Sequence, residues 1–256
     1  MCILFVAMGQ HPDYPLIIAA NRDEFHARPT APINWWHKDE NAADVFAGKD
    51  LQAGGTWMGI NKKGRFAALT NYRLIPQQSS GNEHSRGELV LSALSTEDSL
   101  LSEQLHAQRS QYLGYNLLFG DSRQLSCYDS VNDQLHHFTQ GCFSLCNGPI
   151  HDIWPKMAKG EKALARYVEE TKSVEHEVLF DLLNDRTEAP DNLLPSTGLP
   201  SDWEKKLSAI FIVGEEYGTR SSCVLTINNQ QQVIVTERTY NTSGEIINEA
   251  SEHWQL

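Results

Sequence analysis

The stretch Cys2-Ile3-Leu4-Phe5-Val6-Ala7-Met8, followed after a turn by Pro15-Leu16-Ile17-Ile18-Ala19-Ala20, decides the fold. The turn between these two apolar runs contains glycine, proline and aspartate, which interrupt regular structure. Two short apolar runs joined by a polar turn predict two buried strands that pair with each other. The second run ends abruptly in Asn21-Arg22-Asp23-Glu24, so the pairing is expected to bring these four polar residues back beside Cys2.

Cys2 stands directly after the start methionine, and this position changes what its thiol can do. If Met1 is removed, the residue carries a nucleophilic thiol and a basic α-amine. An α-amine has a pKa of roughly 7.7–8.0, close to the ~8.5 of a thiol, so it can take the thiol proton. Attack on a carbonyl also needs a group that orients the amine and donors for the oxyanion. Asp23 is a candidate for the first role. Asn71 and Asn147, each just past a buried strand, are candidates for the second. The alternative is that Cys2 is a small apolar residue that begins a core strand.

Composition limits the partners and the compartment. The chain has 256 residues, a net charge of −12 and a pI of about 5.2, with no Lys/Arg cluster, which argues against nucleic-acid partners. Five cysteines at irregular spacing do not form a disulfide framework and indicate a reducing compartment. The N-terminal apolar run is too short for a membrane span and is not preceded by Lys or Arg, so no integral membrane segment or signal peptide is predicted. We expect a cytoplasmic protein.

The remaining chain alternates between groups of strands and pairs of helices. A hairpin is predicted from 57–61 and 66–70 around the turn at Gly64. Ser85 to Glu88 has capping-box spacing, which predicts a helix that begins near Glu88. The other predicted helices cover 97–106, 155–170 and 174–183, and the other predicted strands cover 115–119, 125–128, 134–138, 142–146, 209–213, 222–227 and 232–239. This order favours an α+β fold in a single domain over 1–256. The proline-rich loop 189–200 is expected near the substrate side.

Other patterns that carry chemistry are incomplete. HExxH is absent, and Cys142 and Cys146 have no second pair of ligands, so no metal site is predicted. The glycine-rich segment 47–56 lacks P-loop spacing, and no GxSxG nucleophile elbow is present. Trp35-Trp36 is explained either by packing under a loop or by a wall of a binding site.

Several blocks of the sequence resemble the NRDE family, also called the transport and Golgi organisation protein 2 family. The blocks run nearly end to end along the chain. They are Ala20-Asn21-Arg22-Asp23-Glu24-Phe25, Gly54-Gly55-Thr56-Trp57-Met58-Gly59, Thr70-Asn71-Tyr72-Arg73, Ser85-Arg86-Gly87, Leu145-Cys146-Asn147-Gly148, Trp154-Pro155-Lys156 and Tyr217-Gly218-Thr219-Arg220-Ser221.

This family in turn resembles the N-terminal nucleophile (Ntn) hydrolases, in the branch of penicillin V acylase and bile salt hydrolase. The resemblance implies a four-layered αββα sandwich with two antiparallel sheets between helical layers. It also implies Cys2 as nucleophile, Asp23 as holder of its amine, Asn71 and Asn147 as oxyanion residues, and Arg220 near the thiol. One position departs from the acylases, because Ala20 stands where they have an arginine three residues before the aspartate. Arg22 instead directly precedes Asp23, so on a strand it points to the opposite face.

Two functions remain open. The first is hydrolysis of linear, non-peptide C–N amide bonds, or of thioesters, by Cys2, with no cofactor required. The second, which the family resemblance implies, is a non-enzymatic haem-trafficking or acyl-CoA/lipid-binding protein, with His26, His37, His84 and His151 as candidate haem ligands or gate residues. In either case the partner is a small molecule, and the sequence does not fix the oligomeric state. The predicted substrate contacts are Asn21, Arg22, Trp35, Trp36, Trp57, Tyr72 and Arg73.

Overall fold

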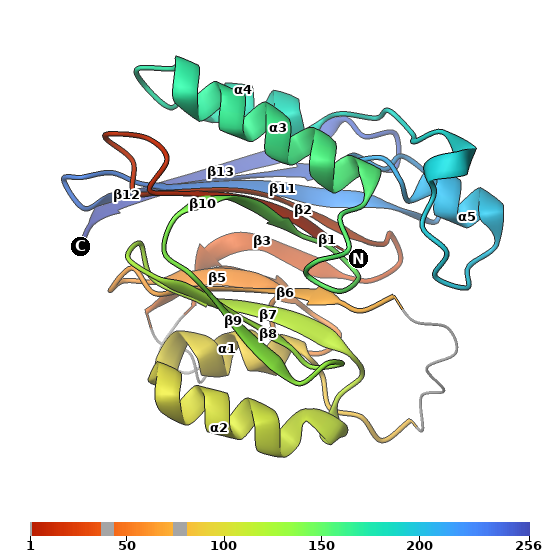
Figure 1. Cartoon of the computed structure of the whole chain (residues 1–256), viewed down its shortest axis with the longest axis horizontal. Helices are drawn as coiled ribbons and strands as arrows, with labels where there is room; N and C mark the ends of the chain where they lie inside the picture. Colours follow the sequence, from red (N-terminus) through yellow and green to blue (C-terminus); the bar gives the residue numbers. More distant parts are fainter. Residues whose placement is uncertain (1, 37–43, 74–80) are drawn as a thin grey trace.

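Secondary structure stacks in four layers in the order helix, sheet, sheet, helix (Figure 1). The computed structural model describes residues 2–36, 44–73 and 81–256. Helices α3 (Pro155–Glu170) and α4 (His176–Leu183) cover the outer face of one sheet, and α1 (Gly87–Ser95) and α2 (Asp98–Gln108) cover the outer face of the other. This αββα arrangement confirms the predicted α+β class. The described residues contain no helix that is long and apolar enough to span a membrane.

The first sheet has six antiparallel strands and contains both N-terminal strands. Its strands are, in spatial order, β10 (Gly141–Leu145), β1 (Cys2–Met8), β2 (Leu16–Phe25), β11 (Tyr217–Ile227), β12 (Gln232–Tyr240) and β13 (Ile246–Gln255). Strands β1 and β2 pair from Met8 opposite Leu16 to Cys2 opposite Arg22, as the two apolar runs predicted. Because β11 pairs with the other edge of β2, the polar end of β2 is held on both sides.

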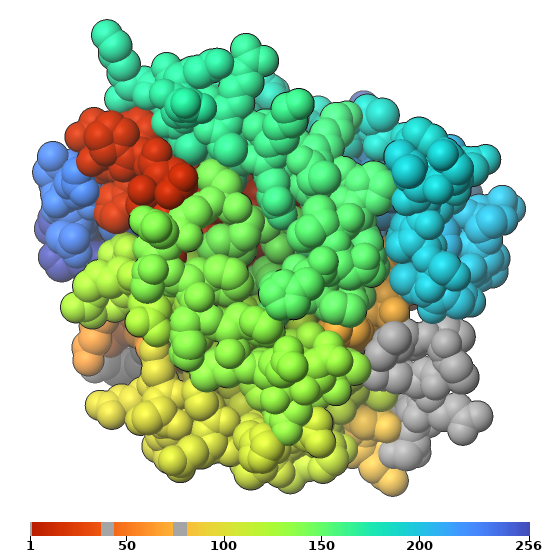
Figure 2. Space-filling view, in the orientation of Figure 1, coloured from red at the N-terminus to blue at the C-terminus, as the bar shows by residue number. Residues whose placement is uncertain are grey.

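The second sheet has seven antiparallel strands that follow one another in the sequence. They are β3 (Thr30–Trp35), β4 (Val45–Asp50), β5 (Met58–Asn61), β6 (Phe66–Asn71), β7 (Tyr115–Gly120), β8 (Leu125–Asp129) and β9 (Gln134–Phe138). The connection from β9 to β10 carries the chain into the first sheet. In Figure 2 the green segment that includes this connection crosses the middle of the visible face, between the two halves of the molecule.

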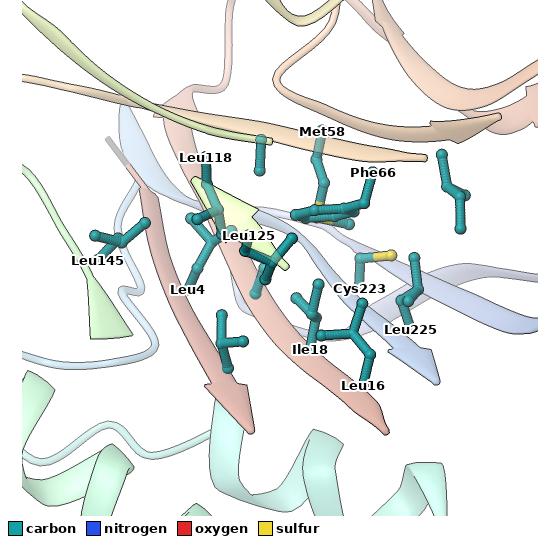
Figure 3. Packing of buried hydrophobic residues seen from close by; sticks show 14 of the residues in the cluster. Leu4, Leu16, Ile18, Met58, Phe66, Leu118, Leu125, Leu145, Cys223 and Leu225 are labelled. Atoms are coloured by element: carbon teal, nitrogen blue, oxygen red, sulfur yellow. The ribbon is translucent and has the colours of Figure 1, made fainter. Parts of the chain in front are cut away.

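Side chains of β1 and β2 point alternately to the two faces of their sheet, so these strands contribute to two separate hydrophobic cores. Leu4 and Leu16 face the second sheet and meet side chains such as Phe66 and Leu118 (Figure 3). Phe5 faces the other way, toward the helices of the outer layer. Each such buried side chain contributes roughly 1.5–3 kcal/mol by leaving water. Cys2 is two residues before Leu4 on the same strand, so its side chain points the same way, into the core between the two sheets.

Several predicted elements differ from the structure. The run 209–213 is buried but is not a strand, since the Phe211 N–H donates to the carbonyl of Asp185 and the Ile212 N–H donates to Thr219 Oγ1. The first helix begins at Gly87 without a side-chain cap hydrogen bond, so the capping box expected from Ser85 is not formed. The elements that the sequence did not predict are β3, β4, β13, helix α5 (Ser201–Lys206) and the 3-10 turns η2 (Arg109–Gln111) and η3 (Asp191–Leu193).

Candidate active site

Cys2 lies at the N-terminal end of β1 and borders a pocket of about 550 Å3. The residue is only 9% exposed, so the thiol sits at the inner end of the pocket. The other residues that line the pocket come from both sheets, from α1 and from the loops between them: Arg22, Asp23, Glu24, Phe25, Arg28, Asp50, Ala53, Gly55, Thr56, Trp57, Leu69, Asn71, Gly81, Glu83, His84, Ser85, Arg86, Gly87 and Leu113.

Burial sets the protonation of the two predicted catalytic groups. It raises the pKa of the Cys2 thiol, so the resting thiol keeps its proton at neutral pH. Asp23 is 1% exposed, and burial also raises the pKa of its carboxyl, against the opposing charge of Lys156. Thr219 Oγ1 donates a hydrogen bond of 2.7 Å to Asp23 Oδ1, which fixes the carboxyl at the end of β2.

Arg22 lies directly beside Cys2. The two residues are register partners, and directly opposite residues of an antiparallel pair project to the same face. The side chain of Arg22 therefore lies on the same face of the sheet as the Cys2 thiol. This agrees with the prediction that Arg22 and Asp23, as neighbours on one strand, point to opposite faces. The Arg22 guanidinium lies 4.3 Å from the Trp57 ring centre, and its Nη1 has no hydrogen-bond partner among the described residues.

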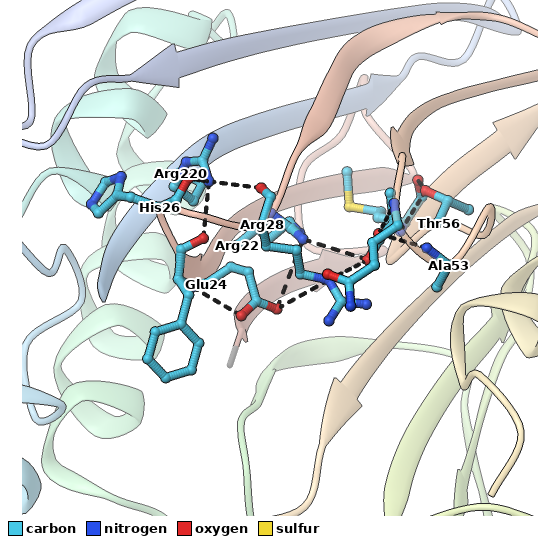
Figure 4. Close-up of polar contacts among 11 residues, drawn as sticks. Arg22, Glu24, His26, Arg28, Ala53, Thr56 and Arg220 are labelled. Carbon is cyan, nitrogen blue, oxygen red and sulfur yellow. Dashed lines mark hydrogen bonds and ion pairs between the residues drawn. The ribbon is translucent and has the colours of Figure 1, made fainter. Parts of the chain in front are cut away.

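Two carboxylates on the pocket rim hold the loop around Arg28. Asp50 Oδ2 accepts a hydrogen bond of 2.6 Å from Arg28 Nε, and Asp50 Oδ1 accepts the N–H of Ala53 (Figure 4). Glu24 and Asp50 come no closer than 3.8 Å and 4.0 Å to Arg22 Nη2. The sequence analysis missed Arg28 and Asp50, because only the fold brings the loop after β4 beside β2.

The opposite part of the wall is built by close backbone contact between a glycine loop and α1. A Cβ atom at Gly55 would come within 2.6 Å of the Gly87 carbonyl carbon, and one at Gly87 would come within 3.1 Å of the Thr56 nitrogen. Both positions therefore require glycine for this approach. Arg86 donates to the carbonyl of Gly114 at 3.1 Å, and burial lowers the pKa of its guanidinium. The two family blocks that carry these glycines were the available signal, and Trp57 was the one site residue predicted in them.

The two predicted oxyanion residues occupy different positions. Asn71 ends β6 and lines the pocket. Asn147 is fully buried, and its Nδ2 donates a hydrogen bond of 2.7 Å to the backbone carbonyl of Asn71. The structure thus places Asn71 in the same pocket as Cys2 and uses the Asn147 side chain to hold the Asn71 backbone.

Arg220 and Asn21 are turned away from the pocket. Arg220 follows a bulge in β11, and its Nη1 donates to the carbonyls of Phe25, His26 and Arg28 at 3.1, 3.2 and 3.1 Å (Figure 4). It clamps the turn after β2, which corrects the expectation of an arginine at the thiol. Asn21 Nδ2 donates to two main-chain carbonyls of the helical side at 2.8 and 2.9 Å, so its amide is not available to a substrate.

Tyr72 and Arg73 form structural contacts beside the site. Tyr72 donates to Asp129 Oδ2 at 3.1 Å, and Arg73 Nη1 donates to Glu204 Oε2 at 2.7 Å in a pair that is 5% exposed on both sides. Neither residue lines the pocket, so the expectation of substrate contacts is corrected in both cases.

Trp57 lines the pocket, whereas Trp35 and Trp36 pack elsewhere in the core. Trp35 packs against Trp254 between the sheets, and Trp36 packs in the core under α1 and α2. Alternation along the end of β3 sends their rings to opposite sides of the sheet. They are not a wall of the pocket, which corrects the expectation of substrate contacts.

Of the candidate haem ligands, His84 borders the pocket. His26 packs near Gly218, and His151 contacts the ring of His136. His37 lies outside the described residues. Within the described part of the chain, no group of three or more His, Cys, Asp or Glu side chains is arranged to hold a metal ion.

Comparison with known proteins connects this geometry to a family and a fold. A family model described as Transport and Golgi organisation 2 matches residues 1–242. The bovine Transport and Golgi organization protein 2 homolog is 30% identical over 260 residues, covering 93% of this chain and 92% of its own length. The human homolog is 29% identical over 277 residues, covering 100% and 96%. A solved structure of a conjugated bile acid hydrolase from Clostridium perfringens matches with a TM-score of 0.54 at 11% identity, covering 100% of this chain and 97% of that one. At this identity the likeness shows the fold alone, which is that of the Ntn hydrolases.

Proposed function

Since the chain belongs to the Transport and Golgi organisation 2 family and has the Ntn-hydrolase fold, we propose that it hydrolyses non-peptide amide or thioester bonds with Cys2 as nucleophile. The observation that carries the proposal is the arrangement of Cys2, Arg22 and Asn71 around one pocket, with Asp23 buried at the same strand end. Removal of Met1, which lies outside the described residues, is part of the proposal because it frees the α-amine of Cys2.

The first step is proton transfer from the thiol. Because burial raises the pKa of Cys2, a preformed thiolate is disfavoured and a base has to accept the proton during attack. The α-amine of the processed Cys2 is that base, and the Asp23 carboxyl orients it. Arg22, on the same face as the thiol, stabilises the negative charge that develops on sulfur.

The second step forms and collapses a tetrahedral intermediate. The sulfur bonds to the carbonyl carbon, and the oxyanion is stabilised by Asn71, whose backbone is held by Asn147. The C–N or C–S bond of the substrate then breaks, and the leaving group takes the proton from the α-ammonium. Water hydrolyses the resulting acyl thioester on Cys2 and releases the acid.

The pocket suits a small molecule with an apolar part. Its volume of about 550 Å3 is within the range of small-ligand sites. Trp57, Leu69 and Leu113 supply apolar surface, and charged residues such as Arg22 and Glu24 share the lining. We place the activity in the cytoplasm, where the five free cysteines remain reduced.

The test begins with the intact mass of the purified protein, which should lack Met1. Wild type, Cys2→Ala and Cys142→Ala are then assayed against a panel of acyl amides and thioesters. Cys142, on strand β10, is not among the residues that line the pocket and is the matched control. We expect activity in wild type and Cys142→Ala and none above background in Cys2→Ala. Retention of Met1, or equal rates with and without the Cys2 thiol, would overturn the proposal.

A second candidate function is binding of haem or an acylated ligand without turnover. Two observations favour it: burial raises the pKa of the Cys2 thiol, which disfavours a resting nucleophile, and His84 on the pocket wall supplies an imidazole that can ligate haem iron. Haem titration should then give a saturable Soret shift that is lost in His84→Ala. His106→Ala is the control, because His106 is exposed on α2 and pairs with Asp133. A Soret response that does not saturate, or one unchanged in His84→Ala, would exclude a haem site at His84.

A further inference from the structure

The N-terminus of helix α1 opens into the same pocket as Cys2. Ser85, Arg86 and Gly87 line the pocket, and the nine-residue helix begins at Gly87. The N-cap residue, Arg86, makes no side-chain cap hydrogen bond. The first turn of a helix carries N–H groups without intrahelical acceptors and a partial positive charge, which together favour an anion. In α1 the Glu88 and Leu89 N–H groups donate to the carbonyls of Ser85 and Arg86 at 3.2 and 3.1 Å, so the donor toward the pocket is the Gly87 N–H.

At this helix end Gly87 is partly exposed and lines the pocket beside Gly55. Gly55 lies so near Gly87 that neither position has room for a side chain. The acidic side chain of the first turn, Glu88, is exposed and is not among the residues that line the pocket; its Oε1 accepts the hydroxyl of Tyr112 at 2.7 Å and lies 3.3 Å from His84 Nδ1. A small anionic group can therefore approach the main chain at Gly87.

Arg22 points independently to an anionic ligand. It is 5% exposed, it lines the pocket, and its Nη1 has no hydrogen-bond partner within the described residues. A buried donor without an acceptor is costly, so a group that supplies an acceptor is favoured there. The nearest carboxylates, Glu24 and Asp50, are at 3.8 and 4.0 Å from Nη2, beyond hydrogen-bond distance.

The remaining charges of the pocket are mixed, since Glu24, Asp50 and Glu83 line it together with Arg22, Arg28 and Arg86. Arg28 is neutralised by Asp50 at 2.6 Å. Among the described side chains, no carboxylate lies within ion-pair distance of Arg86, whose guanidinium donates to the carbonyl of Gly114. Arg22 Nη1 thus remains a donor for a ligand, beside Arg86 and the first turn of α1, while Glu24 offsets part of the charge of both arginines.

We propose that Arg22, Arg86 and the N-terminus of α1 form an oxyanion subsite that binds a carboxylate or phosphate group of the substrate. The substrate class is then an acyl compound that carries such a group within reach of Arg22, which lies beside Cys2. The inference rests on the proposed function for the identity of the pocket as the substrate site. It does not rest on turnover, because equilibrium binding can be measured in a protein that lacks the Cys2 thiol.

The experiment titrates 15N-labelled Cys2→Ala protein with inorganic phosphate and, separately, with glutarate at constant ionic strength. Saturable shifts of the Gly87 and Glu88 amide signals are expected with at least one of the two probes, and the tighter probe identifies the preferred group. Arg86→Met should weaken that binding roughly tenfold to a hundredfold, as expected for loss of a charge-assisted hydrogen bond. Arg123→Met removes an equal charge at an exposed turn and should leave the affinity unchanged.

Arg22→Met is a second variant that keeps the test decisive if Arg86→Met does not fold, and it should weaken binding by a similar factor. Absence of saturable shifts at Gly87 with both probes would overturn the proposal. Unchanged affinity in a folded Arg86→Met or Arg22→Met protein would also overturn it. Absence of hydrolysis by the wild-type protein together with intact anion binding would instead count against the proposed function and leave the subsite standing.

Discussion

Replacing Glu237 by glutamine should stabilise the protein at alkaline pH. Glu237 lies on β12, is 2% exposed, and accepts the backbone N–H of Ile33 in the other sheet at 2.8 Å. Burial raises the pKa of its carboxyl to about 7, although the charge of Arg22 and a hydrogen bond with Ser221 oppose the shift. Glutamine keeps the acceptor for Ile33 and removes the ionisation.

The magnitude follows from linkage between proton binding and folding. The ordinary pKa of this group is 4.5 and its pKa in the fold is about 7. Between these values the folded protein binds a proton that the unfolded chain has released, so stability falls as the pH rises through about 7. Each unit of difference in pKa is worth roughly 1.4 kcal/mol, so wild type loses about 3 kcal/mol of unfolding free energy by the time the pH is above 7. We therefore expect the unfolding free energy of Glu237→Gln to exceed that of wild type by up to about 3 kcal/mol at pH 8.5 and by much less at pH 5.

The assay is urea unfolding followed by tryptophan fluorescence at pH 5, 6, 7 and 8.5. Groups such as Asp23 titrate in both proteins, so the difference between wild type and variant isolates Glu237. Glu103→Gln, on the exposed face of α2, is the control and should show no such trend. A difference between Glu237→Gln and wild type that is the same at every pH would refute the reasoning.

Three further predictions concern stability and are measured by the same unfolding assay. Burial lowers the pKa of His176 from 6.5 to about 4, so between pH 4 and 6.5 the unfolded chain binds a proton that the folded protein does not. Wild type should therefore lose about 3 kcal/mol of unfolding free energy as the pH falls from 7 to 4, and His176→Gln should not show this loss. Arg73→Met should cost about 3–5 kcal/mol because it leaves Glu204 buried without its charge partner, and a cost below about 1 kcal/mol would contradict a buried pair. Gly160→Ala should cost about 1–3 kcal/mol, since the added Cβ would stand 2.1 Å from the Phe5 ring; wild-type stability would contradict this packing.

The elements that the sequence predicted are those with a strong local pattern. The paired runs at 2–8 and 16–20 and the hairpin around Gly64 combine apolar runs with turn residues, and each forms as expected. Strand β13 escaped prediction because it is an edge strand with polar residues on both faces, so it carries no apolar run. The run 209–213 was misassigned because burial alone produces the same apolar pattern as a strand.

That Cys2 and Asp23 line one pocket was predictable, because it depends on their positions in the chain. Cys2 and Asp23 follow from a nucleophile near the terminus and the polar end of the strand that returns beside it. Arg86 and Asp50 could not be predicted, because their role depends on loops that only tertiary packing brings together. Arg220 was predicted to lie near the Cys2 thiol, but nothing in the sequence indicated the bulge in β11. At this bulge the Arg220 side chain donates to main-chain carbonyls instead.

The central claim is that the Cys2 sulfur forms a covalent acyl intermediate. The direct measurement is the intact mass of protein quenched in acid after brief mixing with an activated acyl ester, followed by peptide mapping. We expect one acyl group on Cys2, removed by hydroxylamine, absent in Cys2→Ala and retained in Cys142→Ala. An acyl group on another residue, or none on Cys2 in a protein that still releases the acid, would contradict the account.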